Sequence, residues 1–299
     1  MIGELAALSA AITWAYASVA YKPFIERYGA LRVNAMRTLY ASIAALVPAL
    51  LLGLERPAAL WAMASGAVSL GAGDTMYLAS IGLVGVSVAG PASYTFIIMA
   101  EVMAIAVGER LTPLLAGAGA LVLIGVALVS WGPRGRARPL GVVLALGAAL
   151  AWASGWVMIR VADVGGLSPI SSAFLRAATA GLILSAAGAV RGERLGDALR
   201  GTIGTRLPLV AAADLAGGSA LFALAIWVAG VDRSMVIIGS MPLFAQAMAW
   251  ATGAERPSAL EVAGAALVVA AGALAFLLGG APAPPPASRG RGGSPPRAP

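Results

Sequence analysis

The sequence predicts an all-α polytopic membrane protein with about ten transmembrane helices in two inverted five-helix repeats. Over 299 residues, 60% are hydrophobic and only 11% are charged, whereas soluble domains carry roughly 25% charged residues. The apolar residues form blocks of about 20, the length needed to cross a hydrocarbon core of about 30 Å. The second set of blocks also repeats the first. These observations predict a duplicated bundle of membrane-spanning helices.

Hydropathy and turn signals place the boundaries of the expected spans. The spans are 3–21, 32–53, 58–80, 84–107, 111–131, 140–160, 169–190, 207–229, 234–253 and 258–279. The first block is interpreted as a retained span, because no basic segment precedes it and no clear cleavage site follows it. Residues 280–299 are rich in Pro, Gly and Arg, and are expected to be a disordered tail.

The internal repeat is seen where the segment from Gly3 is laid over the segment from Gly141. The matched pairs are Trp14 with Trp152, Lys22 with Arg160, Arg37 with Arg176, and Glu109 with Glu255. Five is an odd number of spans, so the second repeat must enter the membrane from the side opposite to the first. We therefore expect two inverted repeats, 3–131 and 140–279, around a central site.

Two absent residue types restrict the chemistry of this chain. It has no cysteine and no histidine, which excludes thiol chemistry, a Ser-His triad and an HExxH zinc site. No ATP-binding loop motif is present either. We expect no catalytic residue, metal or cofactor. The formal charge of +7 is attributed to contact with anionic lipid headgroups, and no nucleic-acid partner is expected.

Taken together, the duplicated Trp, Arg and Glu-Arg positions resemble the ten-helix EamA-type members of the drug/metabolite transporter superfamily. One departure is that Pro242 lies thirteen residues before Glu255, whereas Phe96 holds the matching place in the first half. The resemblance implies a central cavity lined by the first, third and fourth helices of each half. It also implies a plasma-membrane secondary transporter, most simply an exporter of a small metabolite, amino acid or drug.

Three acidic residues fall inside expected spans, namely Asp74, Glu101 and Asp214. A charge in the bilayer costs about 2.5–3.5 kcal/mol on insertion scales, so each is a functional candidate. The hypothesis is that they bind the substrate or couple its movement to protons. Glu101 comes first, because Tyr94 lies seven residues earlier on the same helical face and is a candidate substrate contact. The alternative is that each acid only fixes helix packing.

Other candidates are aromatic, polar or bend-forming. Trp14 and Trp152 are expected in the middle of their helices, where they either line a substrate cavity or pack the scaffold. Gln246 is a further substrate-binding candidate, with an interhelical hydrogen bond as its alternative. Pro91 and Pro242 interrupt the fourth and ninth spans, either as hinges or as static kinks.

The charged residues at helix ends are given structural roles. Arg37 and Arg176 lie near expected helix starts and are interpreted as snorkelling toward lipid headgroups. Glu109 and Glu255 each precede an arginine and are expected to fix a short connection between helices. None of these four is expected to be a main substrate contact.

Two alternative functions stay open at this point. The first is a non-transporting receptor or scaffold. The second starts from Gly71-Ala72-Gly73-Asp74, a GxGD string that resembles intramembrane aspartyl proteases, with Asp214 as the second carboxylate. The protease interpretation is the weaker, since no Tyr-Asp pair precedes the string.

Orientation and assembly follow less directly from the sequence. Basic residues outside the spans favour both termini outside the cell, whereas the family resemblance implies both termini in the cytoplasm, and the latter is expected here. The expected partners are a small solute, with proton coupling as a hypothesis, and membrane lipids, with the chain as a monomer or homodimer.

Overall fold

The computed structural model describes residues 1–54, 58–96, 98, 99, 103, 113–134, 138–164, 166–229 and 237–278, and the described part is entirely helical. The first half contains α1 (Ile2–Tyr28), α2 (Ala30–Leu52), α3 (Ala58–Ser65), the π-helical segment η1 (Gly66–Gly73), α4 (Asp74–Val84), α5 (Val86–Ser93) and α7 (Pro113–Trp131). The expected span 58–80 is observed as the continuous run α3, η1 and α4, which ends four residues later than expected.

The second half repeats this order with one addition. It contains α9 (Pro139–Val164), α10 (Pro169–Val190), α11 (Leu195–Thr202), α12 (Leu207–Ala211), the π-helical segment η2 (Ala212–Gly218), α13 (Ser219–Ala229), α15 (Met241–Ala251) and α16 (Ala259–Leu278). The sequence predicted only a connection where α11 lies, because its eight residues are too few and too polar for a span. Its buried Ala198 and Thr202 face the bundle, whereas Arg194 and Arg200 are exposed.

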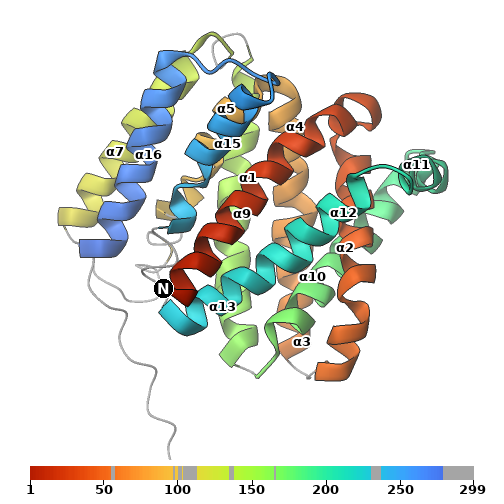
Figure 1. Cartoon of the computed structure of the whole chain (residues 1–299). Coiled ribbons are helices and arrows are strands. Elements are labelled where there is room, and N and C mark those ends of the chain that lie inside the picture. The colour runs from red at the N-terminus through yellow and green to blue at the C-terminus, as the bar shows by residue number, and fades with distance from the viewer. Residues whose placement is uncertain are drawn as a thin grey trace, which may run out of the picture.

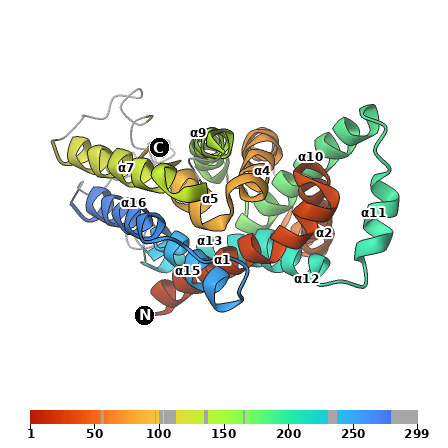
Figure 2. The ribbon, with the colours of Figure 1, turned by 90° about the horizontal axis from the view of Figure 1, so that it is seen from above.

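The helices of the two halves are interleaved (Figures 1 and 2). On one flank α7 packs along α16, and on the other α2 packs along α10. Between these pairs, α1 of the first half packs against α13 and α15, while α9 of the second half packs against α3, η1 and α4. Neither half is a separate bundle, so a site at the centre must be built from both.

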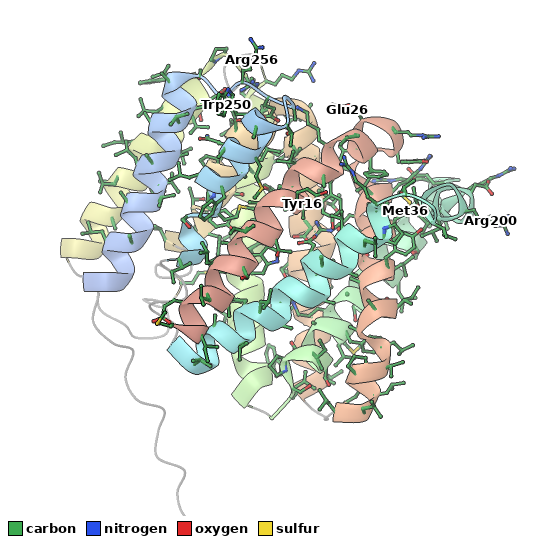
Figure 3. The ribbon with its side chains drawn as sticks, in the orientation of Figure 1. Tyr16, Glu26, Met36, Arg200, Trp250 and Arg256 are labelled. Atoms are coloured by element: carbon green, nitrogen blue, oxygen red, sulfur yellow. The ribbon has the colours of Figure 1, made fainter. Side chains whose placement is uncertain are left out.

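The outer surface is apolar, as expected of helices that face lipid. Within the described residues, four helices are long and apolar enough to cross a membrane: Ile2–Tyr28, Ala30–Leu52, Ala58–Val84 and Pro169–Val190. On α2 the side chains of Val47 and Leu51 are exposed, and on α10 so is that of Leu182. Charged side chains lie at the ends instead, with Arg256 and Glu26 at one end of the bundle and Arg200 on α11 (Figure 3).

The fourth and ninth spans are both interrupted near a proline. The fourth span leaves the helix at the turn Tyr94–Thr95, three residues after Pro91, and α15 begins at Met241, so that Pro242 stands in its first turn. Proline is well tolerated there because the first amides of a helix lack intrahelical acceptors. Pro242 is therefore at the start of a helix segment, not in the middle of an unbroken one.

Candidate functional site

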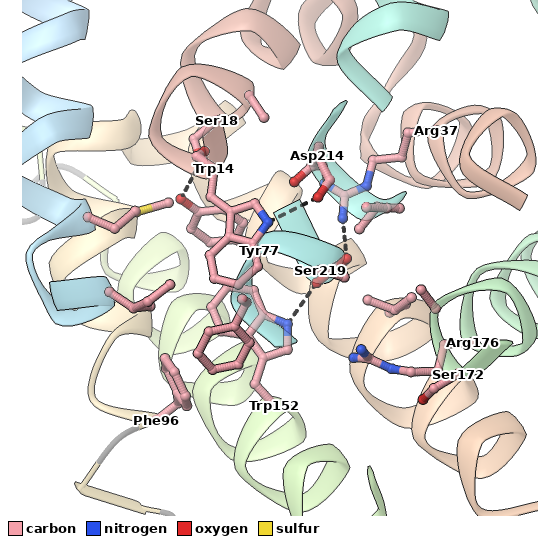
Figure 4. A pocket seen from close by; sticks show the side chains of 18 of the residues that line it. Trp14, Ser18, Arg37, Tyr77, Phe96, Trp152, Ser172, Arg176, Asp214 and Ser219 are labelled. Carbon is pink, nitrogen blue, oxygen red and sulfur yellow. Dashed lines mark hydrogen bonds and ion pairs between the residues drawn. The ribbon is translucent and has the colours of Figure 1, made fainter. Parts of the chain in front are cut away.

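A cavity of about 440 Å³ lies at the centre of the bundle between the two halves. The described residues that line it come from both halves and include Trp14, Ser18, Tyr21, Arg37, Leu70, Asp74, Tyr77, Tyr94, Phe96, Trp152, Leu167, Pro169, Ser172, Arg176, Asp214, Ser219, Phe222 and Met241. Most of the wall is aromatic or aliphatic, and the charged groups gather on one side (Figure 4). Mainly apolar pockets with a few placed polar groups are typical small-molecule sites.

Arg37 is the centre of the charged group. Its side chain is only 6% exposed, and its guanidinium forms ion pairs with Asp74 and, at 3.3 Å, with Asp214. The phenol of Tyr21 donates a hydrogen bond of 2.8 Å to the same Oδ2 of Asp214, and the guanidinium of Arg37 lies 5.0 Å from the Tyr21 ring centroid. Two buried carboxylates from different halves are thus held by one buried arginine.

This arrangement brings together the two aspartates that the sequence placed at similar depth. It also corrects the expectation for Arg37, which does not snorkel toward headgroups but points into the bundle. Helix α2 begins two residues before the expected span, so that Arg37 stands about two turns inside the helix. Arg176 stands at the same depth in α10 and lines the cavity as well, which corrects its expected role too.

Each of the two tryptophans forms a hydrogen bond with a residue of the other half. Trp152, on α9, donates from Nε1 to Oδ1 of Asp74 at 2.7 Å, and Trp14, on α1, donates to the backbone carbonyl of Asp214 at 3.0 Å. Trp14 also meets Phe222 edge-on, with ring centroids 5.7 Å apart. Both indoles line the cavity, so each combines the two roles, lining and packing, that the sequence left open.

Each tryptophan lies against a glycine that ends a π-helical segment. A Cβ added to Gly73 would come within 2.9 Å of Cδ1 of Trp152, and one added to Gly218 would collide with the indole of Trp14. Glycine is needed at both places because the indole and the helix backbone approach so closely. Gly73 and Gly218 are therefore equivalent positions in the two halves, and π-helical turns of this kind are frequent at functional sites.

The remaining candidates are placed as follows. Tyr94 lines the cavity and contacts Phe96 edge-on, with centroids 5.5 Å apart. Gln246 is not among the described residues that line the cavity. Its amide donates to the carbonyls of Ser87 and Glu261, which is the interhelical alternative and corrects the expectation of substrate contact. Glu101 lies outside the described residues.

A buried carboxylate lies at one end of the bundle. Glu255, between α15 and α16, accepts hydrogen bonds from the amides of Val86 and Ser87 and from the Ser87 hydroxyl, and forms an ion pair of 3.0 Å with Lys22. It thereby caps the N-terminus of α5, where orphan amides favour a negative charge. Gly85, with φ +78°, allows the tight reversal from α4 into α5 directly beneath this carboxylate.

These contacts change the acidity of Glu255. Burial alone would raise the pKa of this carboxyl, but the hydrogen bonds from Ser87, Lys22 and the Val86 amide outweigh burial and hold the pKa below its usual range. The residue is therefore an anion at neutral pH. The connection that it fixes is the reversal between α4 and α5, whereas the sequence predicted that it fixes the connection in which it lies. At the other end, the cavity lining reaches Leu167 in the α9–α10 connection and Pro169 at the start of α10.

Comparison with known proteins gives the class of this fold and site. The EamA-like transporter family matches the chain twice, over residues 1–131 and 139–277. The chain therefore belongs to the EamA-like transporter family, whose members are transporters and not enzymes. The expected resemblance to the drug/metabolite transporter superfamily is confirmed, and so is the prediction of an integral membrane protein.

Two individual relatives are similar to parts or all of the chain. An uncharacterized transporter of Archaeoglobus fulgidus is 29% identical over 159 residues, which cover 51% of this chain and 56% of that protein. The chain thus matches little more than half the length of this relative. One solved crystal structure superposes with a TM-score of 0.59 at 19% identity, covering 92% of this chain and 96% of the other, which shows a shared fold.

The charged cluster also bears on the protease interpretation. Asp74 and Asp214 both contact Arg37 and each accepts a further hydrogen bond, from Trp152 and Tyr21 respectively. A carboxylate pair that is to share a proton and activate water needs the two acids next to each other, whereas here an arginine stands between them. Together with membership of a transporter family, this leaves the GxGD string without a catalytic role.

Proposed function

We propose that this protein is a secondary transporter that moves a small solute across the plasma membrane by alternating access, as an exporter. The observation that carries the proposal is the central cavity, which both halves build with the equivalent residues Trp14 and Trp152. Inverted repeats allow two conformations of similar energy, open to opposite sides of the membrane around one central site. The two repeats, 3–131 and 140–279, are the units that exchange these conformations.

The cavity supplies both recognition and coupling in this proposal. Trp14, Trp152 and Tyr94 offer an aromatic wall on which an apolar part of the solute packs. Asp74 and Asp214 are the groups that take up or release a proton, because they are the carboxylates among the described residues that line the cavity. In this proposal, Glu101 is left as a sequence-based candidate.

The breaks near Pro91 and Pro242 support a route for the motion. Gly90 lies beside Pro242, with an added Cβ 3.8 Å from the proline Cβ, so the two interrupted spans meet where they break. In the proposed cycle, α5 and α15 rotate about these points. The end at which Glu255 caps α5 opens as the end near the α9–α10 connection closes.

Flux into proteoliposomes tests the proposal. Purified protein is reconstituted and screened with amino acids, organic anions and cationic drugs under an imposed proton gradient. We expect saturable flux that the gradient drives uphill in wild type, and only downhill exchange in Asp214→Asn. Glu26→Gln, on the exposed surface, is the matched control and should behave like wild type. No flux for any solute in the panel would favour the scaffold interpretation.

A further inference from the structure

The two arginines of the cavity face different groups although they occupy equivalent positions. Four residues before Gly73 stands Ser69, and four residues before Gly218 stands Asp214. Arg37 lies 3.3 Å from the Asp214 carboxylate, while Arg176 donates from Nη2 to the Ser69 hydroxyl at 3.1 Å. The repeat therefore places a carboxylate beside one arginine and a neutral hydroxyl at the same register beside the other.

The surroundings of Arg176 form one end of the cavity. Ser172 lies one helical turn earlier on α10 and also lines the cavity. Figure 4 shows the Arg176 guanidinium extending from α10 toward the centre of the site, on the side of Trp152. Phe96 meets Trp152 edge-on at 6.0 Å, and Tyr77 meets it at 5.1 Å. A cation and hydroxyls thus stand next to an aromatic wall.

We propose that Arg176, with the hydroxyl of Ser172, binds the anionic group of the transported solute, a carboxylate or a phosphate, while Trp152 and Phe96 hold its apolar body. This inference rests on the proposed transport function. A guanidinium presents a planar fork of donors that matches a carboxylate or phosphate in two parallel hydrogen bonds. The bound anion takes, beside Arg176, the place that Asp214 takes beside Arg37.

The charge of the cavity is compatible with one further anion. Arg37 forms ion pairs with both aspartates, and Asp74 also interacts electrostatically with Arg176. Among the described lining residues, two side chains are cationic and two are anionic. Arg176 is partly buried, so an ion pair between the solute and its guanidinium is screened less than one at the surface. A cationic solute would instead meet the Arg176 end with repulsion.

Binding of matched probes to the purified full chain tests the inference without requiring transport. The probes are 3-phenylpropionate, phenyl phosphate and phenethylamine, which share a ring and differ in their charged group, and the measurement is isothermal titration calorimetry in detergent. We expect at least one of the two anions to bind wild type at least tenfold more tightly than the amine. The tighter of the two anions identifies carboxylate or phosphate as the preferred group.

Two variants place the binding at Arg176. Arg176→Gln should weaken the anion about tenfold, the loss of roughly 1.4 kcal/mol, and leave the amine within about twofold. Ser69→Asp creates beside Arg176 the pair that Asp214 makes with Arg37, so it should remain folded and also lose the anion. Ser65→Ala, on the same run of helix but not among the described lining residues, is the control and should bind like wild type.

Three results would overturn the inference: tighter binding of the amine, no binding of either anion, or unchanged anion affinity in Ser69→Asp. The proposed function is judged separately, because flux of a cationic solute through wild type and Ser69→Asp alike would support transport while refuting an anion site. Conversely, anion binding that Ser69→Asp abolishes, without flux of any solute, would support the site and refute transport.

Discussion

The indole nitrogen of Trp152 lies 2.7 Å from Oδ1 of Asp74, so a residue of the second half holds a carboxylate of the first. The reciprocal contact differs, since Trp14 donates to the backbone carbonyl of Asp214 and not to its carboxylate. Hydrogen bonds to charged groups contribute about 1.5–3 kcal/mol, and neutral ones about 1 kcal/mol. The two tryptophan contacts are therefore similar in geometry, but the one with the Asp74 carboxylate contributes more to stability.

This difference in hydrogen-bond energy predicts that substituting Trp152 and substituting Trp14 lower the free energy of unfolding by different amounts. Trp152→Phe should lower the free energy of unfolding by about 2 kcal/mol, and Trp14→Phe by about 1 kcal/mol, because only the former leaves a buried carboxylate without one of its donors. Both losses are measured by thermal unfolding in detergent, with the circular dichroism of the helical backbone as the signal, because this does not depend on tryptophan. Equal losses would mean that the bond to Asp74 adds nothing beyond ring packing.

Arg37 should be far more sensitive than a surface arginine. Arg37→Gln leaves two buried carboxylates without their cation, and such a loss costs about 3–5 kcal/mol. Arg32→Gln is the control, because its ion pair with Glu193 is partly exposed and should be worth less than about 1 kcal/mol. A similar shift of the unfolding temperature in both variants would contradict the view that Arg37 organises the site.

Glu255 predicts a particular dependence of stability on pH. Its pKa in the folded chain is lowered, so its contribution is present above the pKa of an unfolded glutamate, about 4.3, and is lost as pH falls from there through the folded value. The unfolding temperature of wild type should therefore fall more steeply than that of Glu255→Gln over this window. Glu26→Gln provides the surface control, and parallel curves for Glu255→Gln and wild type would contradict the prediction.

Gly73 and Gly218 each lie against a tryptophan, so replacing one of them with alanine should cost more stability than replacing a neighbouring glycine. Gly218→Ala drives a Cβ into the indole of Trp14, and overpacking of this kind costs about 1–3 kcal/mol. Gly217→Ala is the matched control, since its Cβ would meet nothing nearer than the Ala212 carbonyl at 3.7 Å. Thermal unfolding of the pair should separate them clearly, and Trp14→Phe should relieve part of the cost in the Gly218→Ala background.

The chain contains no cysteine, which makes access to the cavity directly measurable. Ser219→Cys introduces one thiol into the cavity lining. An impermeant maleimide should label it from the side at which the α9–α10 connection lies, and labelling from the other side should rise when Glu255→Ala removes the cap on α5. Labelling from one side only, unchanged by Glu255→Ala, would exclude Glu255 from closing that end.

The sequence was sufficient to predict the fold and to suggest part of the candidate site. Apolar block length predicts spanning helices because the bilayer thickness sets it, and both duplicated tryptophans line the central cavity, while their contact with a substrate stays a prediction. Asp74 and Asp214 stood out since charge in a span is costly. These signals are local, so they can be read from one chain without knowledge of its packing.

Sequence analysis missed residues whose roles depend on their depth in the bundle or on the form of their helix. Arg37 and Arg176 were assigned to the headgroup region because each lies near an expected helix start, and only the packing of α2 against α10 turns both into the bundle. The π-helical segments left no hydropathy signal, yet they set the register of Gly73 and Gly218. Gln246 was assigned to the substrate site because it is polar and lies deep in a span, but depth alone does not reveal which neighbour a polar residue contacts.

The difference between Ser69 and Asp214 bears on why the two halves are joined in one polypeptide. An antiparallel dimer of identical chains would have to carry the same residue at both places, so it would present either two carboxylates or two hydroxyls to its arginines. Fusion removes that constraint, because each copy can mutate on its own. A duplicated chain can therefore build a cavity with distinct ends that orients an asymmetric molecule, which a symmetric dimer of identical chains cannot.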